Sequence, residues 1–225
     1  MVIGGPVSER VDHATDAVRD GATAVVLWPP APSALEAERL AAHADEAGVE
    51  IGVARPLAAS TALSSVSWSA RLVTLSLVGR TDGRLAQAGW RTALAGALDV
   101  CAALTEGRGT SRLDVAAERD GDALRAVVLA ARFGNGAYAQ ASIRFSDARD
   151  DEVTLYASRP GARLEAQSLA VPFGLEGAAA LADDLEAAEV DAFLEAAAEG
   201  QPAPFALDRA LATMRLAERV RQHLR

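Results

Sequence analysis

The sequence contains no lysine, so every basic side chain other than its three histidines is an arginine. It has a single cysteine, Cys101, which excludes an intrachain disulfide, and no Cys/His group has the spacing of a zinc site. Cys101 lies in an apolar stretch and is interpreted as a small core residue.

No apolar run approaches the roughly 20 residues that span a bilayer, and no signal-peptide pattern is present. We therefore expect a cytoplasmic protein with no metal site.

Positive charge is scarce as well. The 22 basic residues face 31 acidic ones, which gives a formal net charge of −9 and a pI of about 4.9. Proteins that bind phosphate backbones rely on clustered cations, so we expect no nucleic acid as a partner. The absence of a spanning segment likewise predicts no membrane partner. Half of the residues are hydrophobic and 24% are charged, which is typical of a globular protein.

The first 60 residues alternate helices with short apolar runs. One helix is predicted over Asp12–Asp20, with Gly21 as its stop. A second begins at Ser33, whose spacing to Glu36 is that of a capping box, and ends at Gly48. The unbroken runs predict strands buried on both faces, as in a parallel sheet. These runs are Ala22–Trp28, before Pro29-Pro30, and Val49–Ala54, before Arg55-Pro56, and they complete a βαβ unit.

The pattern changes after Ser60. Val66–Val78 alternates apolar and polar residues but changes phase, which predicts a bulge or bend in one long strand. A helix is predicted over Ala93–Leu104. Further strands are predicted over 112–118, 124–131, 137–145, 152–157 and 162–166, joined by the turns Asp120-Gly121, Gly134-Asn135-Gly136 and Arg159-Pro160-Gly161. We therefore expect an antiparallel sheet.

Two amphipathic helices are predicted to close the chain. The first carries an apolar stripe from Leu181 to Phe193, and the second a stripe from Leu207 to Leu224. Gly200–Pro204 separates them.

Six segments match, in order along the chain, the motifs of one family. In the N-terminal part, Ala24–Pro29 fits "D-A-V-x-I-x-T-P" and Gly48–Ala58 fits "A-G-K-x-V-x-x-E-K-P-L-A". In the middle, the hairpin Arg132–Ala137 fits "F-x-N-G-A" and Ser158–Leu164 fits "G-x-x-G-x-L". Near the C-terminus, Asp191–Pro202 fits "F-L-x-A-I-x-x-G-x-x-P" and Asp208–Arg221 fits "A-L-x-x-x-x-L-x-E-A". In these segments the chain resembles the Gfo/Idh/MocA oxidoreductases, which convert sugars and polyols with NAD(P).

The resemblance implies an α+β protein. A remnant βαβ of a Rossmann-like domain would cover residues 1–60. Over residues 61–225 it would be followed by a mostly antiparallel, open-faced sheet with helices packed on one side. In this family the exposed sheet face commonly builds the oligomer interface. The resemblance thus implies a homo-oligomer, or a hetero-oligomer with an active family member, formed through the sheet face.

The family's dinucleotide site is not recognisable. A pyrophosphate is held by a strand, a glycine-rich turn and a helix N-terminus, and that unit would precede the βαβ unit. Met1–Pro6 contains glycines, but no strand of useful length precedes them and Pro6 removes a donor; Gly134–Ala139 lies between strands. We therefore expect no cofactor, with NAD or NADP as the alternative. The candidates for contacting a nucleotide are Trp28, Pro29 and Arg55.

The catalytic residues that the resemblance implies are also absent. Arg55 stands in place of the lysine of "E-K-P", and a guanidinium does not exchange its proton near neutral pH. The family's catalytic Asp and His lie four residues apart on one helix. One alignment places Thr92 and Gly96 at these positions, and the other places Asp99 and Ala103 there, so neither supplies a histidine. No catalytic residue is assigned, and the remaining candidates are Arg55, Asp99 and Arg91.

Three hypotheses follow. The favoured one is a catalytically inactive, oxidoreductase-like protein that does not bind NAD(P) and serves as an oligomerising scaffold or partner subunit. The loss of a positioned acid or base costs about a hundred- to ten-thousand-fold in rate, which supports this choice. The alternative is an active NAD(P)-dependent sugar or polyol oxidoreductase with rearranged residues, in which Trp28 and Trp90 stack on a sugar. The third is a gene remnant that folds poorly.

Overall fold

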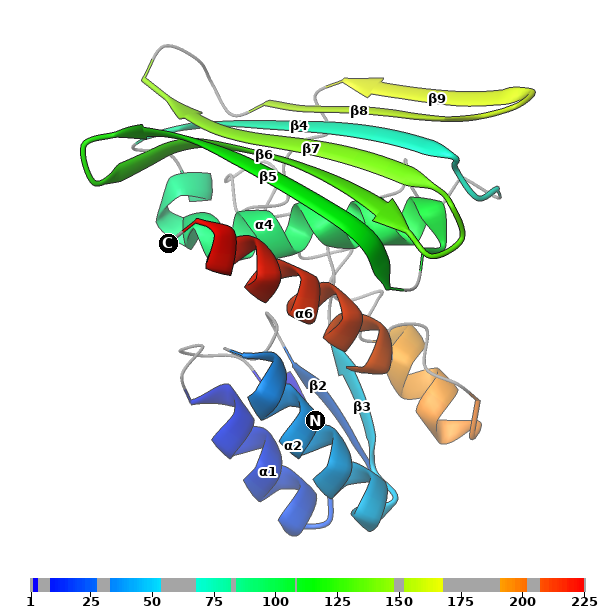
Figure 1. The fold of residues 1–225 in the computed structure, drawn as a ribbon. Helices are drawn as coiled ribbons and strands as arrows, with labels where there is room; N and C mark the ends of the chain where they lie inside the picture. The colour runs from blue at the N-terminus through cyan, green and yellow to red at the C-terminus, as the bar shows by residue number, and fades with distance from the viewer. Residues whose placement is uncertain are drawn as a thin grey trace. The chain divides into compact units, whose positions relative to one another are not determined.

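The structure, a computed structural model, describes residues 2–3, 9–27, 33–53, 68–81, 84–107, 109–147, 152–167, 191–201 and 207–224 (Figure 1). They divide into two compact units. Unit 1 takes residues 1–56 and 183–218, and unit 2 takes 57–182 and 219–225. The sequence predicts a single division after residue 60, and those domain limits stay a prediction.

Unit 1 is built on a small parallel sheet. Its order is β1(Val2–Ile3), β2(Ala24–Leu27) and β3(Glu50–Val53), and both neighbouring pairs are parallel. The crossovers carry α1(Arg10–Arg19) and α2(Ala34–Ala47). The predicted βαβ unit is therefore present. The βαβ unit consists of β2, α2 and β3. It is preceded by the short strand β1, which pairs with β2, and by α1, which connects the two.

The ends of α2 are formed by the residues that the sequence indicated. Ser33 Oγ accepts the Glu36 backbone N–H at 3.2 Å and donates to Glu36 Oε2 at 2.6 Å. This satisfies one of the free amides of the first turn. Gly48 ends the helix with φ 68°, a conformation that glycine adopts without a steric penalty. The capping box and the glycine stop are thus confirmed.

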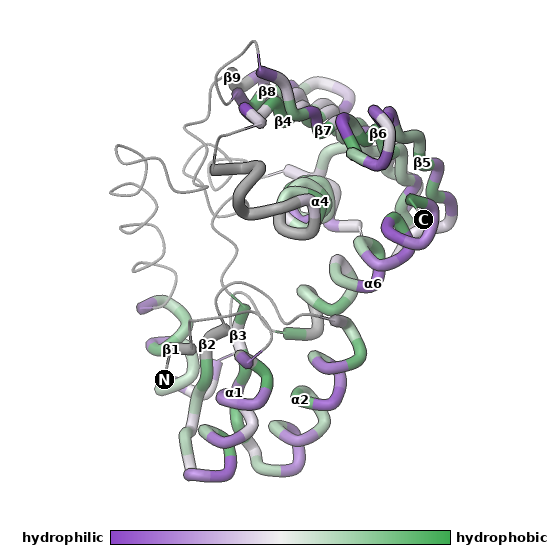
Figure 2. The backbone as a smooth tube through the Cα atoms, turned by 90° about the vertical axis from the view of Figure 1, so that its left-hand side faces the viewer, coloured by the Kyte–Doolittle hydropathy of each residue, from purple (hydrophilic) through white to green (hydrophobic). Residues whose placement is uncertain are grey.

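The core of unit 1 lies between the small sheet and the helices. Figure 2 shows hydrophilic and hydrophobic residues alternating along α1 and α2, as expected for helices with one buried face. α6(Leu207–His223) adds apolar side chains to this core. Glu218 of α6 accepts the Ala34 N–H at the start of α2 at 2.8 Å, and Arg215 pairs with Glu38. The principal core residues are Ala14, Ala17, Val25, Ala37, Leu40, Val53, Leu207, Ala210 and Met214.

Unit 2 is a six-stranded sheet with the order β5-β6-β7-β4-β8-β9. All neighbouring pairs are antiparallel except β4 and β7, which are parallel. The predicted mostly antiparallel sheet is confirmed, as is the α+β class. The strands are β4(Leu72–Arg80), β5(Thr110–Asp120), β6(Ala123–Phe133), β7(Tyr138–Ser146), β8(Glu152–Arg159) and β9(Ala162–Gln167).

One helix, α4(Arg84–Thr105), covers one face of this sheet (Figure 1). Every second residue of the central strands is buried on that face, for example Val73, Leu75 and Leu77 of β4. The prediction of one long strand from Val66 was wrong, because β4 begins only at Leu72 and then keeps a single phase. Residues 68–71 are not strand, which removes the apparent phase change, and 66–67 lie outside the described residues.

The C-terminal end of α4 is held by polar side chains. Its last carbonyl, Thr105 O, accepts bonds from Asn135 Nδ2 at 2.7 Å and from Ser69 Oγ at 2.9 Å. Glu106 follows at φ 50°, and Gly107 N–H bonds back to Ala102 O at 3.3 Å. Carbonyls that the helix leaves without intrahelical partners are thereby satisfied. The hairpin Arg132–Ala137 thus has a structural role at this end.

The chain closes with two helical segments. Most of the stripe predicted from Leu181 lies outside the described residues, whereas residues 191–198 are helical. α6 is confirmed, and its last residues belong to unit 2. There Arg219 donates to Thr110 Oγ1 at 2.7 Å, and Arg119 donates to the Leu224 carbonyl.

Candidate functional site

α4 carries the positions where the resemblance implied catalytic residues. Asp99 is 7% exposed and lies among buried apolar side chains of this helix. Gly96 is half-buried and Ala103 is exposed, and neither can exchange a proton. Arg91 and Thr92 belong to α4, but their side chains lie outside the described part. The candidates Arg55, Trp28 and Pro29 also lie outside it, directly after β3 and β2.

Cys101 is not a nucleophile. It is fully buried one helical half-turn from Asp99. Burial raises the pKa of the Cys101 thiol to about 12, with the charge of Asp99 as the second cause. A cysteine is nucleophilic only as its thiolate, and at neutral pH Cys101 keeps its proton. It is therefore an inert core residue, as interpreted from the sequence.

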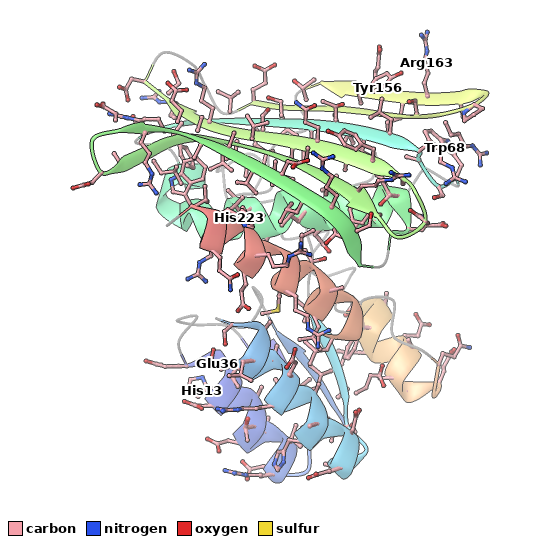
Figure 3. The ribbon with its side chains drawn as sticks, in the orientation of Figure 1. His13, Glu36, Trp68, Tyr156, Arg163 and His223 are labelled. Atoms are coloured by element: carbon pink, nitrogen blue, oxygen red, sulfur yellow. The ribbon has the colours of Figure 1, made fainter. Side chains whose placement is uncertain are left out.

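The three histidines lie on three different helices, α1, α2 and α6. His13 is exposed on α1, and His43 on α2 lies 4.0 Å from Glu46 of the same helix. His223 Nδ1 lies 2.8 Å from the Arg219 carbonyl of its own helix. Figure 3 shows His13 and His223 on separate elements. The sequence of α4 itself, where the resemblance implies an imidazole, contains no histidine.

Trp90 is half-buried and packs against the sheet. Its ring meets that of Phe145 edge to face, with centroids 4.7 Å apart and planes at 82°. Such a pair stabilises the contact between α4 and β7. Trp68 lies at the sheet's end with the Arg159 guanidinium 5.5 Å from its ring centroid.

The open face of the sheet is the face turned away from α4, and all six strands contribute to it. Its residues form four rungs that cross the strands in the order β5, β6, β7, β4, β8, β9. Tyr156 and Arg163 point away from α4 on this face in Figure 3. The first rung is Arg112, Arg132, Tyr138, Leu72, Ser158 and Arg163; the second is Asp114, Ala130, Gln140, Thr74, Tyr156 and Glu165; the third is Ala116, Val128, Ser142, Ser76 and Thr154; the fourth is Glu118, Ala126, Arg144, Val78 and Glu152.

The open face differs from the rest of the chain in hydrophobicity and charge. Among the described residues, five large hydrophobic side chains are exposed, and three of them lie on it: Leu72, Val128 and Tyr138. The four rungs carry four arginines and four carboxylates, so they are formally neutral in a chain with net charge −9. Neutral, partly apolar surfaces of this kind are suited to protein contacts.

The sequence analysis described alternation only along Val66–Val78, and it missed the rungs that cross the sheet. Two examples are the pairs Leu72↔Tyr138 and Arg112↔Arg132. A rung depends on strand order and register. β4 pairs with β7 across more than 60 residues of sequence, and no local motif predicts that pairing.

Comparison with known proteins places the fold. No protein-family model and no curated protein matches the sequence. Solved structures do match. The UDP-N-acetylglucosamine 3-dehydrogenase GnnA from Acidithiobacillus ferrooxidans is 16% identical over 98% of this chain and 76% of that chain, with a TM-score of 0.83. GenD2 from gentamicin A biosynthesis, in complex with NAD, is 16% identical over 100% of this chain and 76% of that chain, with a TM-score of 0.73. An oxidoreductase from Agrobacterium radiobacter, in complex with NAD+, L-tartaric acid and magnesium, is 12% identical over 100% of this chain and 78% of that chain, with a TM-score of 0.72.

The chain therefore has the fold of a dehydrogenase. More particularly, it has the fold of the Gfo/Idh/MocA-type dehydrogenases and oxidoreductases, as the motifs had implied. At these identities the likeness concerns the fold, and the residues of each site are argued from this chain alone.

The expectation of no cofactor is wrong. Two of the matching structures are complexes with NAD, so the comparisons point to NAD rather than to no cofactor. That expectation required a complete glycine motif after a long strand. It did not foresee that the two-residue β1 precedes α1 and pairs in parallel with β2.

Among the described residues, neither a membrane-spanning helix nor a metal-binding cluster is present. None of their helices is long and apolar enough to cross a membrane. No group of three or more His, Cys, Asp or Glu among them is placed to hold a metal ion.

Proposed function

We propose that this chain is a non-catalytic, oxidoreductase-like subunit that associates with another chain through the open face of its sheet. The observation that carries the proposal is the position of the exposed apolar side chains. Leu72, Val128 and Tyr138 lie on one rigid, formally neutral face, whereas single exposed hydrophobic residues are usually scattered. Covering them removes apolar area from water and stabilises a complex.

The non-catalytic role is supported by α4. Its buried side is filled by apolar side chains such as Leu94, Leu98 and Val100, with Asp99 among them. Asp99 has no histidine four residues away on either side. A carboxylate without a positioned imidazole lacks the proton acceptor that oxidation of an alcohol near neutral pH requires.

The association is tested with one substitution on the open face and one away from it. Val128→Asp places a charge on the third rung, and Leu35→Asp places the same charge at an exposed position of α2. Light scattering of the wild type should give a mass above the 23.3 kDa of one chain. V128D should return it to the monomer while L35D leaves it unchanged. A monomeric wild type at tens of micromolar contradicts the proposal.

NAD is the nucleotide that we propose for this fold. The described residues fit it in backbone order, because β1 and α1 supply a strand and a following helix, with Gly4 and Gly5 between them in the sequence. When bound, NAD supplies a hydride acceptor. Isothermal titration with NAD, with ADP-ribose in parallel to isolate the pyrophosphate half, should give saturable binding. No heat with either ligand contradicts this assignment.

A second candidate function is an active sugar or polyol oxidoreductase. It is favoured by the matching structures, which are dehydrogenases and oxidoreductases, and by the buried charge of Asp99 on α4. The test is NADH formation with a panel of polyols, using Asp99→Asn as the control. Turnover that D99N removes without loss of the folded state supports this candidate and contradicts the non-catalytic role.

A further inference from the structure

One end of the sheet in unit 2 is rich in exposed arginines. It is the end at which β4 and β5 begin and at which the hairpins β6–β7 and β8–β9 turn. Arg112, Arg132 and Arg163 lie on the first rung, at this end of the open face. Arg71 directly precedes β4, and Arg159 is the last residue of β8. All five side chains are exposed, and we call this group the arginine end.

The arginine end places like charges close to one another. Arg112 of β5 pairs directly with Arg132 of β6. Further along the same end, the Arg71 N–H donates to the Ser158 carbonyl at 2.8 Å, which brings the backbone of Arg71 next to that of Arg159. Like charges directly opposite each other on neighbouring strands destabilise a sheet. The arrangement therefore costs folding stability, and an anion bound between the guanidinium groups would reduce that cost.

The described part of the chain neutralises only one of these five guanidinium groups. Arg112 Nε lies 2.7 Å from Asp114 Oδ2. The other four arginines form no ion pair with any residue that the structure describes. Glu165 follows Arg163 by two residues on β9 and shares its face, yet the two are not within ion-pair distance. A surplus of positive charge thus remains at this end.

Two further contacts hold arginine side chains in place without neutralising them. Arg71 Nη1 donates to the Asn135 carbonyl at 2.8 Å. The Arg159 guanidinium lies 5.5 Å from the centroid of the Trp68 ring. Figure 3 shows Trp68 and Arg163 at the same end of the sheet. Side chains that are already ordered lose less conformational entropy when a ligand binds.

We propose that the arginine end binds a short acidic segment of a partner protein, laid across the strands in an extended conformation. Arg112 and Arg163 lie on the two edge strands of the six-stranded sheet, and a strand spacing of about 4.8 Å places them about 24 Å apart. An extended peptide of about eight residues has this length. Its carboxylates match the guanidinium group, which can bind each of them through two parallel hydrogen bonds.

The charge of the remaining chain limits the size of the ligand. The whole chain carries −9 and these five side chains carry +5, so the rest of the chain carries −14. A nucleic acid or an anionic membrane extends past the arginine end and meets this negative charge, which acts over a Debye length of about 8 Å at 0.15 M salt. A segment of about eight residues stays over the arginines. The distribution of charge therefore favours an acidic peptide.

The inference is tested by isothermal titration of the full chain with octaglutamate in about 0.05 M NaCl, where we expect saturable binding that weakens as salt is added. The double variant Arg132→Gln/Arg163→Gln removes two guanidinium groups that have no ion pair and keeps long polar side chains. We expect R132Q/R163Q to raise the Kd about three- to tenfold, in samples with native circular dichroism. Absence of saturable binding to the wild type overturns the inference.

The matched control is Arg125→Gln/Arg144→Gln, which changes the net charge by the same amount. Both residues lie toward the opposite end of the sheet, where Arg125 pairs with Asp120 at 3.1 Å and Arg144 with Glu118 at 3.3 Å. We expect R125Q/R144Q to leave the Kd within about twofold of wild type. Equal weakening by the two double variants would show that net charge alone attracts the peptide, and it would overturn the inference.

Two larger polyanions decide between classes of partner. Single-stranded DNA of about 20 nucleotides and vesicles that contain phosphatidylserine should both bind more weakly than octaglutamate at equal salt. Tighter binding of either one, lost in R132Q/R163Q, overturns the assignment to a peptide.

The inference goes beyond the proposed association through the open face, and the two can fail separately. Light scattering gives the mass of the sample used for titration. No peptide binding to a chain whose mass exceeds that of one copy overturns this inference and leaves the association standing. Peptide binding to a monomer supports this inference and contradicts the association.

Discussion

At the scale of single residues, Asn135 links two parts of unit 2. Its Nδ2 donates to Thr105 O at the end of α4, and its Oδ1 accepts the Ala137 N–H at 3.1 Å within the hairpin. We expect Asn135→Ala to lower the free energy of unfolding by roughly 1–2 kcal/mol, since two bonds are lost at a partly buried place. Urea denaturation measures this value.

Asn135→Asp serves as the control, because a carboxylate keeps the turn bond and loses only the donor to Thr105. Because two acceptor oxygens then face each other at Thr105 O, its destabilisation should equal or exceed that of N135A. A smaller loss than in N135A would mean that the turn bond to Ala137 contributes more than the bond to Thr105. The sequence identified Asn135 as a turn residue, but its bond to a carbonyl 30 residues earlier depends on the packing of the sheet on α4 and is not visible in the motif.

Cys101 gives a pH dependence with a defined sign. Its pKa is raised from 9.0 to about 12 in the folded protein, so the native state holds the thiol proton more tightly than the unfolded chain does. The resulting stability is fully present below pH 9 and is lost as the pH rises from 9 toward 12. In this window the slope approaches about 1.4 kcal/mol per pH unit for one group.

The measurement compares wild type with Cys101→Ala in urea titrations at several pH values between 7 and 11. The two curves of stability against pH should run parallel below pH 9 and converge above it, because the alanine has no proton to lose. Curves that remain parallel to pH 11 would show that the folded-state pKa of Cys101 is not raised.

At the scale of elements, β3 and the helical segment 191–198 fit together through a single glycine. A Cβ on Gly52 would lie 2.6 Å from Cδ2 and Cε2 of the Phe193 ring, which is fully buried. We expect Gly52→Ala to cost roughly 1–3 kcal/mol, because the ring must move in a packed core. Thermal and urea unfolding measure the loss.

The double variant Gly52→Ala/Phe193→Leu tests the cause. If the clash with the ring is responsible, the combined loss should be smaller than the sum of the two single losses, by roughly 0.5–3 kcal/mol. Strict additivity would show that the cost of alanine arises within β3 itself. Gly48→Ala is a matched control at an open position, where the left-handed φ and not a contact sets the cost.

The elements themselves were largely predictable, for physical reasons. Helix ends such as Ser33 and Gly48 are set by local bonds and φ values, and hairpins are set by glycines such as Gly136 and Gly161 with positive φ. β4 was misplaced because residues 68–71 have the alternation of a strand without its ladder. The two-residue β1 was missed because a strand that short has no periodicity, and only its pairing with β2 defines it.

At the scale of the whole molecule, the open face could be foreseen in part. The family resemblance indicated an exposed sheet face, but the sequence did not indicate which residues share it. The rungs required the strand order, in which β4 lies between β7 and β8.

Net charge and face charge act in opposite directions on association. Each chain carries −9, so two chains repel over the Debye length, whereas the open face is formally neutral and its contacts are short-ranged. That length is about 30 Å at 0.01 M salt and about 8 Å at 0.15 M. Sedimentation at a fixed protein concentration should therefore show more dimer at 0.15 M NaCl than at 0.01 M. A dimer that weakens steadily from the lowest salt concentration would mean that ion pairs, and not the neutral apolar face, dominate the association.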